Sequence, residues 1–158
     1  MFVTRFAPSP TGPLHLGHAY SALLAHDRAR AARGTFVLRI DDLDQTRARP
    51  EWDARIHDDL GWLGLDWPRP VMRQSARLPR YRTALAHLWE MGLLYPCTCT
   101  RGDIRAAVAA PQEGAALHGP DGVIYPGTCR PAAPPKGPMP RDGALRLDMA
   151  RAVARLDR

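Results

Sequence analysis

Near the N-terminus, a short apolar segment is followed by a proline- and glycine-rich loop, a helical pattern and a second apolar segment, and this order limits the possible folds. Residues 2–6 and 35–40 are predicted to be strands, and residues 7–13 form the loop that follows the first strand. Two strands joined by a helix over this length pair in parallel, through a right-handed crossover. We therefore predict an α/β domain built on a parallel sheet.

The helical segments are marked by apolar residues that recur with helical spacing. In the first helix, Leu16, Ala19, Tyr20 and Leu23 are predicted to form one face, and Gly34 follows the last turns. Two further helices are expected to begin near residues 50 and 78 and to end before glycines at 64 and 92. Towards the end of the chain, residues 145–149 alternate like a strand, and residues 150–156 begin another helix.

The composition changes after residue 96. Residues 97–130 contain glycine, proline and isolated apolar residues without clear periodicity, and residues 131–143 include five prolines. We interpret residues 1–96 as the first half of the α/β domain and residues 97–130 as an inserted subdomain. Residues 131–143 are then a stiff proline-rich connector, and residues 144–158 begin the second half of the domain.

The chain is basic, with 22 Lys and Arg residues against 16 Asp and Glu residues, a formal charge of +6 and a pI of about 9.9. A basic surface attracts phosphate-rich partners such as nucleic acids, but an arginine-rich composition is equally typical of a GC-rich genome. No apolar run approaches the ~20 residues of a membrane helix, and the first residues show no signal-peptide pattern. We therefore expect a cytoplasmic protein without a membrane partner.

The loop before the first helix carries the residues best suited to chemistry. A loop that leaves a parallel strand and enters a helix lies where open α/β sheets bind ligands, and the N–H groups of the helix favour phosphate. His15 and His18, three residues apart, can donate hydrogen bonds to phosphate oxygens, and Gly17 permits close approach of a nucleotide. The alternative is a proline-rich loop with two surface histidines.

Three segments resemble those of the glutamyl-tRNA synthetase family, a group of class I aminoacyl-tRNA synthetases. One is Leu38-Arg39-Ile40-Asp41-Asp42-Leu43-Asp44 and another is Gly61-Trp62-Leu63-Gly64-Leu65-Asp66-Trp67. The most specific is the run of fourteen residues Arg5-Phe6-Ala7-Pro8-Ser9-Pro10-Thr11-Gly12-Pro13-Leu14-His15-Leu16-Gly17-His18. The resemblance implies a Rossmann-like class I synthetase catalytic domain, of which residues 1–96 would form the N-terminal half of the nucleotide-binding part.

The resemblance also implies substrates and roles. ATP, accompanied by Mg²⁺, and L-glutamate would react to give glutamyl-adenylate, and the glutamyl group would pass to a tRNA. His15 and His18 would be catalytic and, with Pro8 and Gly17, would bind ATP. Asp41 stands where the family usually has a glutamate, one methylene longer, so its selectivity for glutamate is left open; the alternative for this acidic cluster is a solvated turn. The residues implied to bind glutamate are Arg5, Phe6, Ala7, Pro8, Ser9 and Asp41.

The three cysteines indicate a metal site or reduced, metal-free thiols, because disulfides are disfavoured in the cytoplasm. The pattern Cys97-x-Cys99 with a distant Cys129 resembles the zinc insert of the glutamyl-Q tRNA(Asp) synthetase subfamily. That resemblance implies a structural zinc ion held by these thiols and Tyr125. His118 is the alternative fourth ligand, because structural zinc prefers nitrogen or sulfur.

The subfamily transfers glutamate to the queuosine base of tRNA(Asp), and this is the function that the resemblance implies. The family's Lys-(Met/Leu)-Ser-Lys loop is absent, since Lys136 is the only lysine and lies in the proline-rich connector. We therefore expect this chain alone to be inactive. The alternatives are the N-terminal part of an ordinary glutamyl-tRNA synthetase and an inactive remnant that binds ATP or tRNA.

Overall fold

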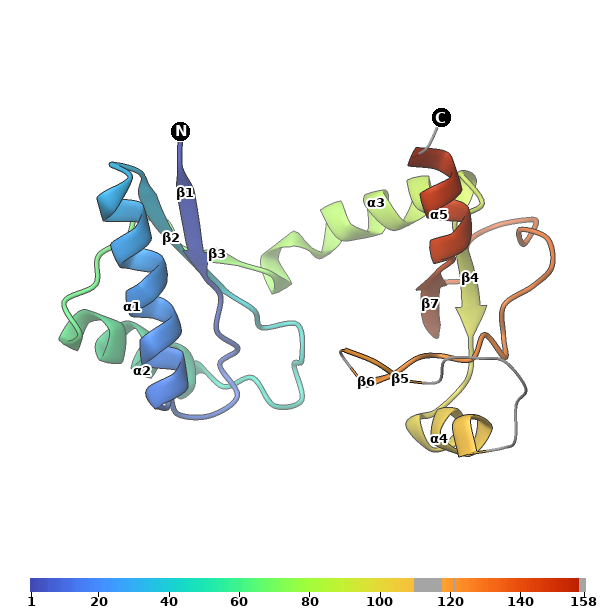
Figure 1. Cartoon of the computed structure of the whole chain (residues 1–158), viewed down its shortest axis with the longest axis horizontal. Coiled ribbons are helices and arrows are strands. Elements are labelled where there is room, and N and C mark those ends of the chain that lie inside the picture. The colour runs from blue at the N-terminus through green and yellow to red at the C-terminus, as the bar shows by residue number, and fades with distance from the viewer. Residues whose placement is uncertain (110–117, 121, 157–158) are drawn as a thin grey trace. The chain divides into compact units, whose positions relative to one another are not determined.

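The computed structural model describes residues 1–109, 118–120 and 122–156 and divides into two compact units, Met1–Arg80 and Tyr81–Arg158 (Figure 1). Among these residues, the first unit contains one three-stranded sheet and the second contains two two-stranded sheets, β4-β7 and β5-β6; each unit is described by itself. The boundaries predicted from the composition, after residues 96, 130 and 143, remain predictions.

The first unit is an α/β layer with three parallel strands in the order β1-β2-β3. In β2 every second side chain is buried, namely Phe36, Leu38 and Ile40, so one face of the sheet carries the core. The predicted α/β class and parallel sheet are confirmed. The elements are β1 (Val3–Phe6), α1 (Leu16–Ala31), β2 (Thr35–Ile40), α2 (Pro50–Trp62), β3 (Met72–Arg73) and the 3₁₀ turn η1 (Ser75–Arg77).

The core of this unit joins the strands to both helices. Ile56 and Leu60 of α2 are almost completely buried and pack in one cluster with the buried face of β2. Burial of side chains of this size contributes about 1.5–3 kcal/mol each relative to exposure. The remaining members of the cluster are Phe6, Ala22, Ala29 and Leu65.

The face of α1 that meets the sheet differs from the one expected. Leu16 and Tyr20 are 85% and 67% exposed, whereas Ala22, His26 and Ala29 are buried. The predicted face was therefore wrong for Leu16 and Tyr20, whereas Leu23, which was also predicted, is partly buried and packs against the core. The helix lies beside β1 and β2 (Figure 1). Alanine side chains are small enough to let a helix pack closely against a sheet, and this close packing outweighs residue size in choosing the face.

The turn after α1 determines how β2 joins β1. Gly34 donates its N–H to the Ala29 carbonyl oxygen at 2.8 Å, and the Thr35 N–H donates to the Phe2 carbonyl oxygen at 2.9 Å. A Cβ atom at Gly34 would lie 2.2 Å from that Phe2 oxygen. Only glycine can therefore occupy this position without moving the two strands apart.

The second unit is organised around an antiparallel strand pair. β4 pairs with β7, so the whole segment 98–143 is an excursion between two neighbouring strands. Trp89 anchors the proline-rich part of this excursion by donating from Nε1 to the Gly137 carbonyl oxygen at 2.9 Å. The elements are α3 (Leu78–Glu90), which begins in the first unit, β4 (Leu94–Cys97), α4 (Arg101–Ala109), β5 (His118–Gly119), β6 (Gly122–Val123), β7 (Ala144–Leu147) and α5 (Met149–Leu156).

The helix α4 was not predicted, because residues 97–130 lack apolar periodicity. Its N-terminus is held by a reciprocal pair of hydrogen bonds: Asp103 N–H donates to Thr100 Oγ1 at 3.1 Å, and Thr100 N–H donates to Asp103 Oδ2 at 2.8 Å. A Thr-x-x-Asp spacing at a helix start is a capping signal that can be read from sequence. The strand predicted over residues 145–149 ends at Leu147, because the buried Asp148 caps α5 through the backbone N–H of Arg151.

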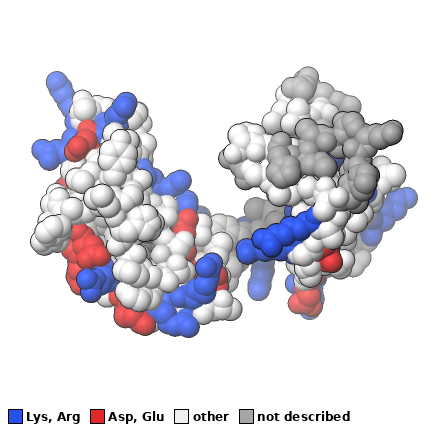
Figure 2. All heavy atoms as spheres, turned by 60° about the horizontal axis from the view of Figure 1, so that its bottom comes forward, with Lys and Arg blue, Asp and Glu red and all other residues white. Residues whose placement is uncertain are grey.

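Arginine side chains are spread over the visible surface of both units, and on the first unit acidic side chains lie between them (Figure 2). Among the described residues, no helix has both the length and the apolar composition needed to cross a membrane.

Candidate nucleotide site and metal centre

The first candidate site lies where β1 and β2 end side by side. The strands pair in register up to Phe6 and Leu38, and the Asp41 N–H then donates to the Pro8 carbonyl oxygen at 2.9 Å. The loop after β1 and the acidic segment after β2 are thus joined at the carboxyl edge of the sheet, where ligands bind in open α/β folds. A cavity of about 190 Å³ beside this edge is lined by Pro10, Asp42, Gln45, Ala48, Arg49, Pro50 and Asp53.

The two histidines form a reciprocal cap at the start of α1. His15 Nδ1 accepts from the Gly17 N–H at 3.2 Å, and His18 Nδ1 accepts from the His15 N–H at 3.3 Å. Their ring centroids are 3.8 Å apart. Because both Nδ1 atoms accept hydrogen bonds, each neutral ring carries its proton on Nε2. Burial and the neighbouring His15 lower the pKa of His18, so this ring acts as a neutral donor near pH 7.

Gly17 is needed for this cap as well as for access by a ligand. A Cβ atom at Gly17 would lie 3.1 Å from Cε1 of the His15 ring. A side chain here would crowd the ring that caps the helix. The structure therefore adds a reason for glycine beyond the close nucleotide approach inferred from the sequence.

The loop residues expected to bind glutamate differ in burial. Arg5 and Ser9 are exposed at the end of β1, Ala7 is half-buried, and Phe6 and Pro8 are buried. The Phe6 ring meets the His18 ring edge-on, with centroids 6.4 Å apart. The side chain of Phe6 thus supports the histidine cap from the core, while Arg5 and Ser9 are placed where a ligand can reach them.

Asp41 is held by an arginine of the preceding strand. Arg39 donates from Nε to Asp41 Oδ1 at 2.5 Å and from Nη2 to Oδ2 at 2.8 Å. Residues two apart on an extended segment project to the same side, which makes this bidentate pairing possible. A carboxylate has about four lone-pair sites, so two donors leave it able to accept from an ammonium group.

The neighbouring acidic residues hold the loop rather than form a freely solvated turn. Asp42 accepts from Ser75 N–H at 2.8 Å and from Ser75 Oγ at 2.5 Å. Burial raises the pKa of Asp42, but the hydrogen bonds from Ser75 outweigh it and bring the pKa below its usual value. Asp44 is bonded by Thr46 and Arg47, which lower its pKa to about 2.

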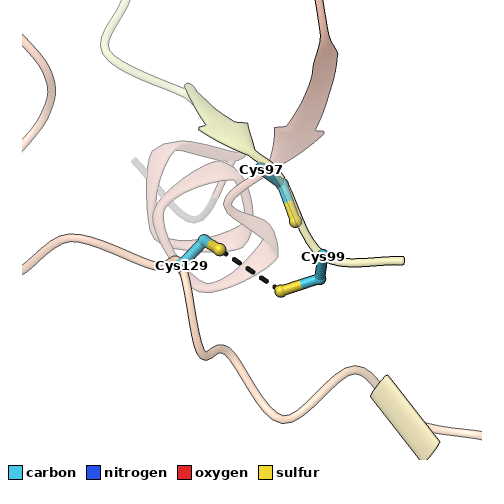
Figure 3. Close-up of side chains that lie close together, drawn as sticks. All are labelled: Cys97, Cys99 and Cys129. Carbon is cyan, nitrogen blue, oxygen red and sulfur yellow. Dashed lines mark hydrogen bonds between the residues drawn. The ribbon is translucent and has the colours of Figure 1, made fainter. Parts of the chain in front are cut away.

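The second candidate site is the group of three thiols in the second unit. Cys97 ends β4, Cys99 follows two residues later, and Cys129 comes from the segment after β6 (Figure 3). Their Sγ atoms all lie within 4.8 Å of one another, and those of Cys99 and Cys129 are 3.3 Å apart. The structure therefore brings together the three cysteines singled out in the sequence.

The Tyr125 hydroxyl lies among these sulfur atoms. Its oxygen is 3.4 Å from Cys97 Sγ and 3.6 Å from Cys99 Sγ, and it accepts from the Cys129 N–H at 2.8 Å. The hydrogen bond with Tyr125 lowers the pKa of the Cys97 thiol to about 6, whereas burial raises the pKa of Tyr125. Three thiols this close together form a group that can hold a metal ion, and thiolates are ligands that zinc prefers. His118 belongs to β5, but its side chain lies outside the described residues.

One residue at this centre was missed in the sequence. Arg146 of β7 donates from Nε to Cys97 Sγ at 3.0 Å, and its guanidinium carbon lies 3.8 Å from the centroid of the Tyr125 ring. The alternating pattern around Arg146 predicts a strand but does not indicate which strand it pairs with. Nothing in the spacing therefore links Arg146 to the cysteines.

Comparison with known proteins assigns the family. The family model described as "tRNA synthetases class I (E and Q), catalytic domain" matches residues 1–118, and the chain belongs to this family. Its fold and its resemblance to glutamate-type synthetases are thereby confirmed.

Several curated proteins and solved structures are similar to this chain over most of its length. The chain is 62% identical over 148 residues to the glutamyl-Q tRNA(Asp) synthetase of Rhodobacter capsulatus, covering 93% of this chain and 53% of that protein. It is 47% identical over 142 residues to the protein of the same name from Symbiobacterium thermophilum, covering 85% and 43%. A crystal structure of a glutamate tRNA ligase from Elizabethkingia meningosepticum in complex with its amino acid matches with a TM-score of 0.57 and 33% identity. That match covers 68% of this chain and 23% of the ligase. The chain thus spans about half the length, or less, of the curated relatives it matches.

Proposed function

We propose that this chain forms the N-terminal part of a catalytic domain that activates L-glutamate with ATP, in a protein that then transfers the glutamyl group to the queuosine base of tRNA(Asp). The observation that supports activation most directly is the carboxyl edge of the sheet, where the reciprocal histidine cap adjoins the loop after β1 and Asp41. The similarity to two proteins named glutamyl-Q tRNA(Asp) synthetase supports the choice of acceptor.

In the proposed reaction, a carboxylate oxygen of glutamate attacks the α-phosphorus of ATP, and pyrophosphate leaves with the electrons of the broken P–O bond. Mg²⁺ accompanies ATP as part of the substrate. The Nε2–H groups of His15 and His18 donate to phosphate oxygens as negative charge shifts towards the leaving group. Pro8 and Gly17 form the backbone surface against which the nucleotide lies. Positioning and charge stabilisation provide the rate enhancement, so no side chain needs to act as a nucleophile.

Glutamate would be held by groups of opposite charge. Arg5, exposed at the end of β1, pairs with a substrate carboxylate through its planar guanidinium. Asp41 pairs with the substrate ammonium group while Arg39 keeps the Asp41 carboxylate in place. Ser9 lies in the same loop and offers a hydroxyl to the substrate. Phe6, which is buried in the core, and the half-buried Ala7 hold the loop in position for the substrate.

The residues of the metal centre fit zinc, and we propose that Cys97, Cys99, Cys129 and Tyr125 hold it. A bound zinc ion would serve a structural role, because all four ligands of a tetrahedral site come from the protein. The pairing of β4 with β7 brings the two ends of the segment 98–143 together, and this segment carries Cys99, Tyr125 and Cys129. His118 remains the alternative to Tyr125, and a comparison of metal affinity in Tyr125→Phe and His118→Ala distinguishes them.

The activation proposal is tested by binding a non-hydrolysable glutamyl-adenylate analogue to this chain, measured by calorimetry. Arg5→Ala is expected to weaken binding by about tenfold to a hundredfold, since a charged hydrogen bond contributes about 1.5–3 kcal/mol. Arg82→Ala is the matched control, because it also removes one exposed arginine but in α3. Equal loss in both variants would assign Arg5 to general electrostatics.

The acceptor is tested separately with the intact gene product and radiolabelled glutamate. We expect charging of tRNA(Asp) that contains queuosine, and none of tRNA(Asp) lacking it or of tRNA(Glu). Charging of tRNA(Glu) would instead favour the ordinary glutamate ligase, the alternative suggested by the 33% identical crystal structure. Absence of glutamate-dependent ATP–pyrophosphate exchange in the intact product would favour a binding remnant.

A further inference from the structure

Arg146 is placed beside the metal centre by the register of the strand pair. In the antiparallel ladder Tyr95 pairs with Arg146, and Cys97 lies two residues beyond Tyr95 on the same strand. Residues two apart share a face, so Arg146 and Cys97 are diagonal neighbours on one side of the ladder. An arginine side chain is long enough to span the gap between diagonal neighbours, and this explains why the Arg146 Nε contacts the Cys97 sulfur.

A single guanidinium contacts two members of the centre in different ways. In its plane it donates to Cys97 Sγ at 3.0 Å, and its carbon lies 3.8 Å from the centroid of the Tyr125 ring. The hydroxyl of the same ring is the oxygen that lies among the three sulfur atoms. Arg146 therefore contacts both a sulfur atom of the centre and the ring that carries its hydroxyl oxygen.

We propose that Arg146 is a positioning residue for the metal centre: it orients Cys97 and Tyr125 for coordination and balances the negative charge of the thiolates. The inference rests on the metal site proposed above and assigns a role to a residue outside its ligand set. Three thiolates around one divalent cation carry a net negative charge, and a sheltered charge is costly unless it is paired. Outer partners of this kind typically change metal affinity by about 10–100-fold.

Arginine is better suited than lysine to both contacts. The guanidinium can donate in its plane while its flat face lies against an aromatic ring, whereas an ammonium group is a compact charge without such a face. Arg146→Lys should therefore restore the charge but not the orientation of Tyr125. This difference separates positioning from simple charge balance.

A purely structural role for Arg146 in the β4–β7 ladder would also lower stability, so a matched control is needed. Arg151 of α5 is in the same unit, donates from Nε to Asp148 Oδ2 at 3.0 Å and from Nη2 to the Ala132 carbonyl oxygen at 2.7 Å. Arg151→Gln thus removes comparable interactions in the second unit without touching the metal ligands.

The test measures zinc affinity by competition with a chelating dye, and the visible spectrum of the Co²⁺-substituted chain, for wild type, R146Q, R146K and R151Q. We expect R146Q to lower zinc affinity by about 10–100-fold and to alter the Co²⁺ absorption bands. R146K should recover part of the affinity while its spectrum stays altered, and R151Q should match wild type in both.

Wild-type affinity and spectrum in R146Q would overturn the inference, as would equal losses in R146Q and R151Q. Combining Arg146→Gln with Tyr125→Phe adds a second readout, because residues that act together give non-additive changes in affinity. Additive losses would mean that Arg146 does not act through Tyr125 and would contradict the proposed orientation. Failure of the wild-type chain to bind either metal would refute the metal site itself, a result distinct from any effect of Arg146.

Discussion

The loop of residues 5–18 and the cysteine centre are built in opposite ways. The loop is one continuous segment whose shape follows from strand pairing, a helix cap and backbone hydrogen bonds. The cysteine centre gathers side chains from three separate segments of the chain, which carry Cys97 and Cys99, Tyr125 and Cys129, and Arg146. The residues of the loop are therefore contiguous in the chain, and Asp41 joins them through a hydrogen bond to Pro8, whereas the cysteine centre has no such continuous segment and depends on long-range closure of the chain.

The two regions also differ in what supports them. Among the described residues, the first unit buries a cluster of nine hydrophobic side chains, whereas those buried in the second unit are Leu93, Leu94, Tyr95 and Cys97. A small core commonly needs a metal or another cross-link to remain folded. We therefore expect metal to stabilise the second unit and to leave the first unchanged.

The largest expected effect comes from removing the thiols. The Cys97→Ser, Cys99→Ser double variant should lose its zinc, about one ion per chain in the wild type, because two of the proposed ligands are gone. Hydrogen exchange should accelerate in β4 and β7 but not in β1 and β2. Elemental analysis of protein purified without chelator provides the metal content.

The matched control for this experiment is the His15→Ala, His18→Ala double variant, which alters the other candidate site. Its metal content should equal that of the wild type. If the thiol variant retained its zinc, the cysteine centre would not be the metal site. Faster exchange in β1 and β2 of the thiol variant would show that the two units are not independent.

A substitution in the core of the first unit should have the opposite effect: it should destabilise the first unit and leave the metal centre unchanged. Leu60→Ala should destabilise that unit by about 2–5 kcal/mol, because Leu60 is completely buried and its truncation leaves a cavity. Urea unfolding followed by hydrogen exchange in β2 measures this loss. Zinc content should stay at the wild-type value, and a parallel loss of zinc would contradict the separate support of the two sites.

The N-terminal cap of α4 can be used to test whether this helix and the metal centre fold together. Thr100→Ala should destabilise this helix by about 1 kcal/mol, since it removes the side-chain oxygen that accepts from Asp103 N–H. Amide exchange within residues 101–109 is the measurement. An unchanged zinc affinity would show that the helix and the metal centre fold separately, whereas a joint decrease would show that they are coupled within the insert.

The smallest expected effect is a pH dependence in the first unit. Burial lowers the pKa of His57 below 6.5, although Asp53 opposes this shift. At higher pH the ring is neutral in both states; as pH falls through about 6.5, the unfolded chain takes up the proton first. The stability conferred by the neutral ring should therefore decrease as pH falls from 6.5 through the lower folded pKa.

This pH dependence is measured by urea unfolding of the Cys97→Ser, Cys99→Ser double variant, which is expected to bind no zinc, so that metal release does not contribute. His57→Gln should reduce the slope of the profile between pH 5 and 7, and the lowered pKa of His18 should leave a smaller slope. A profile that keeps its slope in His57→Gln would assign the effect to another group.

The sequence by itself determined the strand–helix–strand order, the histidine pair at the start of α1 and the closely spaced pair Cys97-x-Cys99. These features depend on hydrophobic period, capping and short spacings, which are local properties of the chain. Thr100 and Asp103 also carried a local signal for α4, although it was missed. Only the tertiary structure decided that α1 buries Ala22 and Ala29 rather than Leu16, because the closeness of helix and sheet selects the face. It alone brought Arg146 to Cys97 and Tyr125, because the register between β4 and β7 is set by long-range pairing that local spacing does not encode.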